Sequence, residues 1–273
     1  MRALIRKSVG EAWPLLVALV ALLFFFQWIQ VWLTSLLDLG AVGIFLQSLP
    51  PVFEAILGIS FKAVATPTGR VAIGYVHPVL LFGTAAWCVA RGSDVVSGEI
   101  GRGTMEMLLA QPVRRLTVLL VPVVVTTLGS LILCVAAWCG TSVGLWWVGL
   151  AREVSPRLFL PAAANLFGAM FFLAGMTTLL SSFDRFRWRT IGLMGGFYIV
   201  EIILKVVARA APRFDWLMYL TFDAAFEPQA LAISPDTAWS TLARYDGVLL
   251  GLGLAAYFGA AVVFCRRDIP PPL

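Results

Sequence analysis

Over residues 13–33 the sequence reads WPLLVALVALLFFFQWIQVWL, with no charged side chain. A helix of about 20 residues crosses the ~30 Å hydrocarbon core of a bilayer, so this segment predicts a transmembrane helix. A third apolar run begins near residue 116 and continues to about 150, which is too long for one upright helix. In all, six apolar segments qualify as spans, at about 13–33, 71–90, 116–140, 158–180, 190–208 and 247–265.

Composition supports the same fold class, an all-α polytopic membrane protein that forms a single domain over residues 1–273. The chain is 60% hydrophobic and 13% charged, whereas soluble domains are about 45–50% apolar and about 25% charged. The runs are continuously apolar, whereas the strands of a membrane barrel alternate polar and apolar residues. The basic residues form no stripe or tail, which argues against binding to nucleic acid. The four cysteines have no metal-ligand spacing, which predicts no metal and favours buried apolar thiols.

The distribution of Lys and Arg predicts the orientation, because cytoplasmic loops carry an excess of these residues. With six spans, both termini and the loops after the second and fourth spans share one side. That side holds twelve basic residues and the other side seven. The twelve are Arg2, Arg6, Lys7, Arg91, Arg102, Arg114, Arg115, Arg185, Arg187, Arg189, Arg266 and Arg267; the seven are Lys62, Arg70, Arg152, Arg157, Arg209, Arg213 and Arg244. We therefore expect a multi-pass protein of the inner (plasma) membrane with both termini in the cytoplasm.

The first segment is expected to be an uncleaved anchor, because its apolar region is longer than that of a signal peptide. Residues 1–12 allow two interpretations. They can form an amphipathic helix on the cytoplasmic leaflet, with Leu4 and Ile5 opposite the basic residues, before the chain turns inward at Pro14. They can also be an ordinary charged flank of the first span.

The loop between the second and third spans is the most informative segment, with the sequence ARGSDVVSGEIGRGTMEMLLAQPVRR at residues 90–115. Ser93 is a candidate N-cap, and the glycines that follow weaken a continuous helix. Thr104 can cap a second short helix with Met105, Leu108 and Leu109 on one apolar face. The spacing predicts an amphipathic helix, and the physics leaves open whether it docks on a partner protein or lies on lipid headgroups.

This loop resembles that of the type-2 ABC exporter permease family, whose pattern is Glu-x-x-x-Gly-Thr-x-Glu-x-Leu-Leu-x-x-Pro-x-x-Arg. The residues that match it here are Glu99, Gly103, Thr104, Glu106, Leu108, Leu109, Pro112 and Arg115. The segment 214–232 also resembles the region before the sixth span in permeases of the multi-copper enzyme maturation subgroup.

The resemblance implies that the loop forms a coupling helix that docks on a separate ABC ATPase subunit. It also implies a second permease copy, identical or paralogous, in the same assembly. With the physical reading of the loop, the expected ATPase-docking residues are Asp94, Glu99, Arg102, Gly103, Thr104, Met105, Glu106, Leu108, Leu109, Pro112 and Arg115.

No lysine of the chain lies in the phosphate-binding pattern G-x-x-x-x-G-K-[ST]. The chain is therefore expected not to be an enzyme and to bind no cofactor of its own. ATP–Mg is expected on the partner ATPase, and membrane lipid is the remaining expected partner. The predicted function is the permease subunit of an ATP-driven exporter.

Three alternatives to this function remain. An ion-coupled secondary transporter needs ionisable groups in the spans, and the candidates are Glu201 with Lys205, four residues apart, and the polar Asn165. The other spans show no acidic residue well inside an apolar run, which argues against this class. A non-transporting membrane scaffold is the second alternative. The most remote is a serine hydrolase, because residues 140–144 read G-x-S-x-G around Ser142, which His77 could activate.

Overall fold

A computed structural model describes residues 1–36, 64, 66–210 and 212–267. In this part of the chain six helical segments are long and apolar enough to cross a membrane, and no strand occurs. The all-α polytopic fold is thus confirmed. The spanning segments are α1 (Arg2–Leu36), Pro67–Gly101, α9 (Arg115–Trp147), Pro156–Phe183, α11 (Arg187–Ala210) and α13 (Pro235–Arg266).

Two spans are built from several elements. The second contains α5 (Pro67–Ala72), the 3-10 turn η1 (Ile73–Tyr75), α6 (Pro78–Ser93), the π-helical turn η2 (Asp94–Gly98) and α7 (Glu99–Gly101). The fourth contains η4 (Pro156–Phe159) and α10 (Leu160–Phe183). The connections carry α8 (Met105–Leu109), η3 (Leu150–Arg152), η5 (Pro212–Leu220), η6 (Phe222–Ala225) and α12 (Pro228–Ile233).

The helices are longer than the apolar runs that predict them. The sixth span begins at Pro235 instead of residue 247, and the second runs on through η2 and α7 to Gly101 instead of ending at residue 90. The third is one helix of 33 residues, about 50 Å long at 1.5 Å per residue. Hydropathy marks the part of a helix that lies in hydrocarbon, whereas polar residues at its ends remain helical, and tilt accommodates the excess length.

The N-terminal residues are part of the first span. Helix α1 runs without a break through Pro14, so no separate surface helix turns inward there. Leu4, Ser8 and Ala12 are buried at intervals of four residues and continue the packed face of the helix. Neither interpretation of residues 1–12 holds in full, because this flank is helical and packs against the bundle.

Small residues let α1 and α9 meet along their length. A Cβ atom added to Gly140 would lie 2.3 Å from the Phe24 carbonyl oxygen, and one added to Gly144 would lie 2.8 Å from Val31 Cβ. Such close approach of two backbones is the usual role of glycine between membrane helices. Helix α10 packs along α13 in the same bundle, with its central residues among the most buried of any span.

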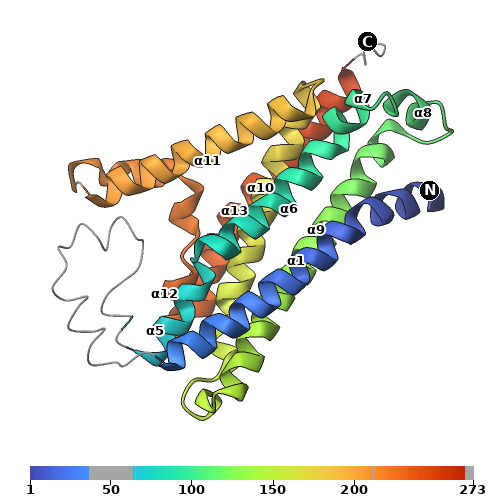
Figure 1. The fold of residues 1–273 in the computed structure, drawn as a ribbon. Helices are drawn as coiled ribbons and strands as arrows, with labels where there is room; N and C mark the ends of the chain where they lie inside the picture. Colours follow the sequence, from blue (N-terminus) through green and yellow to red (C-terminus); the bar gives the residue numbers. More distant parts are fainter. Residues whose placement is uncertain (37–63, 65, 211, 268–273) are drawn as a thin grey trace.

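One end of the bundle gathers the N-terminus, the end of α13 and α7–α8, as the predicted topology requires (Figure 1). Helix α11 leaves this end and diverges from the other spans, so only 17% of its most apolar window is buried in the protein. Lys62, counted above among the basic residues of the opposite side, lies outside the described residues.

Candidate functional site

The end of α6 continues into a π-helical turn, η2, whereas the sequence predicted that the span would end near residue 90 and that Ser93 would cap a new element. A π turn widens the helix and leaves backbone groups without their usual partners. Ser181 of α10 supplies a partner, because its hydroxyl accepts hydrogen bonds from Ser97 N at 2.9 Å and Val96 N at 3.3 Å. The helix therefore continues past Ser93 because a side chain from another span satisfies the turn.

Asp94, the first residue of this turn, is held by three arginines. Arg102 Nη1 lies 2.6 Å and Arg187 Nη1 3.3 Å from Asp94 Oδ1, and Arg91 Nη1 lies 4.0 Å from Oδ2. The side chain of Asp94 is 11% exposed. Its hydrogen bond with Arg102 raises the pKa of that guanidinium above its ordinary value, so Arg102 is permanently charged.

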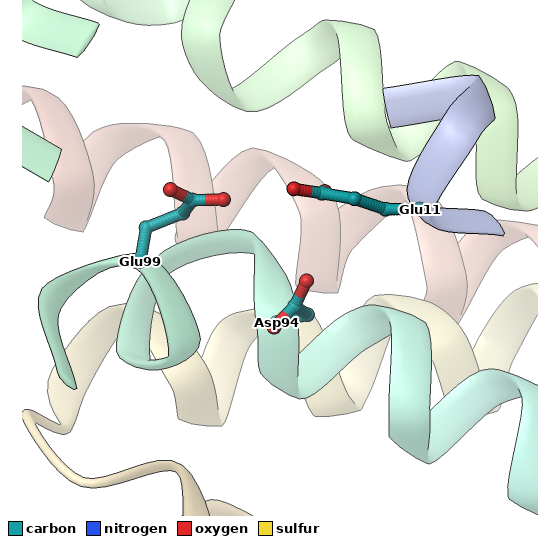
Figure 2. Close-up of side chains that lie close together, drawn as sticks. All are labelled: Glu11, Asp94 and Glu99. Carbon is teal, nitrogen blue, oxygen red and sulfur yellow. The ribbon is translucent and has the colours of Figure 1, made fainter. Parts of the chain in front are cut away.

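Glu99 binds α7 to the N-terminal part of α1. Lys7 Nζ lies 2.6 Å from Glu99 Oε1, which also accepts a hydrogen bond of 2.9 Å from Arg102. Lys7 lies 3.6 Å from Glu11 on its own helix. Figure 2 shows the carboxylates of Glu11, Asp94 and Glu99 gathered between α1 and the η2–α7 segment. Together with their bases they form one ion-pair network that joins α1, α6, η2, α7 and α11.

Carboxylate oxygens from Glu11, Asp94 and Glu99 lie within 4.8 Å of one another, which is close enough to consider a cation. Basic side chains already neutralise them, because Lys7 and Arg102 contact Glu99, and Arg102 and Arg187 contact Asp94. Oxygen ligands that face ammonium and guanidinium groups are poor ligands for a metal ion. The network is therefore a set of ion pairs that holds these five elements together.

The turn from α7 to α8 follows from Gly103. Its φ of +70° is in the left-handed region that favours glycine. Thr104 N bonds to the Glu99 carbonyl at 3.0 Å and Gly103 N to the Ile100 carbonyl at 3.0 Å, the pair of bonds that defines a Schellman helix end. Helix α8 then begins at Met105, directly after Thr104 as predicted. The capping bond is absent, because the Thr104 hydroxyl donates to the Glu99 carboxylate and carbonyl.

Helix α8 turns its predicted apolar face toward its own chain. Met105 is 1% exposed in the main core, and Leu108 and Leu109 are half-buried against the same core. Met107, outside the predicted set, is 64% exposed. Of the expected docking residues, Asp94, Glu99 and Met105 are buried; Gly103, Thr104, Leu108 and Leu109 are half-buried; Arg102, Glu106, Pro112 and Arg115 are exposed. The accessible surface of the loop is thus more polar than the sequence suggested.

The C-terminal end of α13 meets the same region. Arg115 Nη1 donates to the Arg267 carbonyl at 3.2 Å, and Arg267 Nη1 donates to the Ser182 carbonyl at 2.9 Å. Sequence reasoning placed Arg115 in the loop but missed Lys7, Glu11, Arg91, Arg187 and Ser181. Lys7, Arg187 and Ser181 act through partners that are distant in the sequence, so no local signal marks them. Arg91 and Glu11 do have local partners, Asp94 and Lys7, but ion pairs at helical spacing are too common to indicate a site.

The polar residues in the half of the bundle away from the N-terminus contact segments that are distant along the chain. Lys205 pairs with Asp223 of η6 at 3.0 Å, and the described residues show no ion pair between Lys205 and Glu201, the partner that the four-residue spacing allowed. The folded-back segment η5–η6 brings a closer carboxylate to the lysine. Asn165 is fully buried and bridges elements as expected: it donates to the Ala225 carbonyl at 2.8 Å and accepts from Glu227 N at 3.0 Å.

Asp246 changes the count of acidic residues in the spans. It lies inside α13, because that helix begins at Pro235, and its Oδ1 accepts a hydrogen bond of 3.0 Å from Asn165. The sixth helix therefore contains an acidic residue, directly before the apolar run that predicted the span. Because the first turns of α13 are polar, hydropathy alone does not show where this helix begins.

The stretch around Ser142 has no catalytic geometry. It lies within α9, and the Ser142 hydroxyl donates to the Trp138 carbonyl one turn earlier at 2.8 Å. His77 caps the start of α6, where its Nδ1 accepts from Val79 N at 3.2 Å. A nucleophile elbow needs a strand–turn–helix junction, whereas the glycines here serve the α1–α9 contact.

The protein was compared with known proteins at the level of families and of individual sequences. No family model matches the chain, and a search of curated proteins finds no relative.

Proposed function

We propose that this chain is the membrane-spanning permease subunit of an ATP-driven exporter, coupled to a separate ATPase through the loop at residues 90–115. The observation that supports this most is the ion-pair network. It connects the exposed loop to α1, α6 and α11 through Asp94 and Glu99, two carboxylates nearly removed from solvent. A displacement of the loop is thereby passed to three spans.

The docking surface of the proposal is the exposed part of the loop. Met107 offers an apolar side chain on α8, with Glu106 beside it. Arg102, Pro112 and Arg115 are exposed on either side. An exposed apolar anchor within a charged rim is the usual form of a protein interface. Met105, Leu108 and Leu109 support α8 from below.

The energy source is assigned to another polypeptide, because the chain has no phosphate-binding loop. ATP–Mg binds to that subunit, which lies on the cytoplasmic side together with both termini of this chain. A second permease copy completes the assembly. In this arrangement the bundle alternates between two openings when the ATPase pair closes and reopens.

The proposal is tested by co-purification with a candidate ABC ATPase subunit, sought among the reading frames that neighbour this one. Met107→Asp places a charge on the apolar anchor and should lower the amount of bound ATPase about tenfold or more. Met107→Leu keeps the apolar contact and should bind as the unchanged chain does. Glu153→Arg changes charge in the connection after α9, at the opposite end of the bundle, and serves as a second control. Undiminished capture by correctly inserted Met107→Asp would refute the docking role.

One observation favours a second function, an ion-coupled transporter. Asp246 and Asn165 form a hydrogen-bonded pair between α13 and α10, inside two spans. Ionisable residues in such positions often mark ion pathways. Proteoliposomes distinguish the two functions, because exporter activity requires ATP and the ATPase subunit, whereas ion-coupled transport follows an imposed ion gradient without them.

A further inference from the structure

A cavity of about 760 Å³ lies where α11 diverges from α10 and α13. Segments η5 and η6, which fold back from the end of α11, supply another part of its wall. Aromatic and aliphatic residues form most of its lining, together with two charged side chains, Glu201 and Arg244. A volume of this size fits a small organic molecule.

Glu201 is the unusual group in this cavity. The residue is 6% exposed, and its Oε2 atom is buried without a hydrogen-bond partner. The nearest base along α11, Lys205, is engaged by Asp223 at 3.0 Å. No ion pair of Glu201 occurs among the residues that the structure describes. A buried carboxylate oxygen without a partner is costly, and a ligand that supplies a positive charge removes that cost.

Aromatic rings surround the same space. Phe222 lies 5.3 Å from Phe172 and 6.3 Å from Phe197 between ring centroids, and all three line the cavity. Tyr219 and Tyr245 line it as well. Ring faces attract organic cations, and they also provide the apolar surface that the body of such a molecule needs.

Arg244 does not reverse this preference. It is exposed, and its guanidinium lies 5.4 Å from the centre of the Tyr245 ring. An exposed guanidinium is solvated and needs no partner, whereas the buried oxygen of Glu201 does. The unpaired charge in the cavity is therefore the negative charge of Glu201, so a cationic ligand is favoured.

We propose that this cavity binds an organic cation with an apolar, aromatic-compatible body, with Glu201 as its counter-ion. The binding follows from the walls of the cavity and needs no ATPase. Identification of the ligand as the transported cargo rests in addition on the proposed exporter function. Binding of an organic cation and its transport as cargo can therefore be disproved separately.

The test is equilibrium binding of tetraphenylphosphonium to the purified full-length chain in detergent micelles, with protein-free micelles as the blank. This probe carries a fixed positive charge inside four apolar rings. Saturable binding is expected for the unchanged chain. Glu201→Gln keeps the shape of the side chain and removes its charge, so it should weaken binding about 10- to 100-fold. Glu153→Gln, outside the cavity, should change the dissociation constant by less than about twofold.

Two further measurements fix the sign of the recognised charge. Arg244→Gln should leave tetraphenylphosphonium binding unchanged or tighten it. Tetraphenylborate is an anion of closely similar shape, and Glu201→Gln should not weaken its binding. Should Glu201→Gln fail to fold, Tyr219→Leu removes one aromatic wall and should weaken binding of the cation about 2- to 5-fold.

Equal binding by Glu201→Gln and the unchanged chain would overturn the proposal, as would a loss of binding in Arg244→Gln. Saturable binding without ATP-dependent efflux of the probe would uphold the site and count against the exporter function instead.

Discussion

The two halves of the bundle use buried carboxylates in opposite ways. At the end that carries the N-terminus and α7–α8, Asp94 and Glu99 each contact at least two basic side chains. In the other half, Glu201 has a buried oxygen without a partner, beside a cavity of about 760 Å³. The spans meet closely at the first place, and α11 stands apart from them at the second (Figure 1).

This difference indicates that the two ends of α11 have different roles: the first turn is fixed to the network, and a later part lines the cavity. Residue Arg187 at the start of α11 is fastened to Asp94 and to the Ala90 carbonyl, and Glu201 further along faces the cavity. A satisfied network holds one geometry, whereas an unsatisfied polar group favours whatever molecule completes it. A force on the loop would thus move the first turn of α11 and change the cavity along its length.

The largest expected effect comes from breaking the network at its centre. Asp94→Asn leaves Arg91, Arg102 and Arg187 without their shared carboxylate, and should lower the free energy of unfolding by about 3 kcal/mol. Thermal unfolding in detergent measures the loss. Asp236→Asn changes an exposed carboxylate at the start of α13 and should cost less than about 1 kcal/mol. An equal effect of both substitutions would contradict the central role of Asp94.

The second effect concerns the π turn. Ser181→Ala removes the acceptor of the Ser97 and Val96 amides and should cost about 1.5 kcal/mol, the penalty for buried donors left unpaired. Hydrogen exchange of these amides should accelerate. The matched control is Ser182→Ala, because the Ser182 hydroxyl only donates to the Thr178 carbonyl of its own helix. If both variants exchange alike, Ser181 does not hold the turn.

The third substitution should have the opposite sign. Glu201→Met replaces a partly unsatisfied buried carboxylate with an apolar side chain of similar length, and should raise the free energy of unfolding by about 1 kcal/mol. Glu153→Met at an exposed position should have almost no effect. A clear loss of stability in Glu201→Met would mean that this carboxylate is as well satisfied as Asp94, and the contrast between the two halves would disappear.

The smallest effect is expected at the rim of the network. Lys7→Met removes the base that α1 contributes to Glu99, and should cost only about 0.5 kcal/mol because Lys7 is partly exposed and Arg102 still contacts Glu99. The neighbouring Arg6→Met serves as control. A loss above about 2 kcal/mol would show that α1 is held mainly by this one pair instead of by its apolar face.

The sequence was sufficient for features that depend on local pattern. The six spans follow from continuous apolar runs, and the start of α8 follows from Gly103 and Thr104. Helix ends were less predictable: the sixth span begins twelve residues before the apolar run at 247, because its first turns are polar. Asp246 was misplaced for the same reason.

The contacts that join the network to other spans could not be predicted from the sequence, since their partners are far apart along the chain. Lys7 and Glu99 are separated by 92 residues, and Ser181 and Ser97 by 84. Periodicity shows which residues share a face of one helix but not which helix that face meets. The apolar face of α8 was correctly identified as a set, yet its partner is the chain's own core and not another protein.

Hydrogen exchange of the amides in residues 102–114, measured with and without a candidate ATPase subunit that co-purifies with the chain, tests the proposed docking most directly. We expect exchange to slow in this segment when the ATPase binds, most strongly around Met107, while the amides of η5 and η6 at the other end of α11 show no direct protection. Unchanged exchange in residues 102–114 in a complex shown to be intact would contradict the docking of an ATPase on this loop.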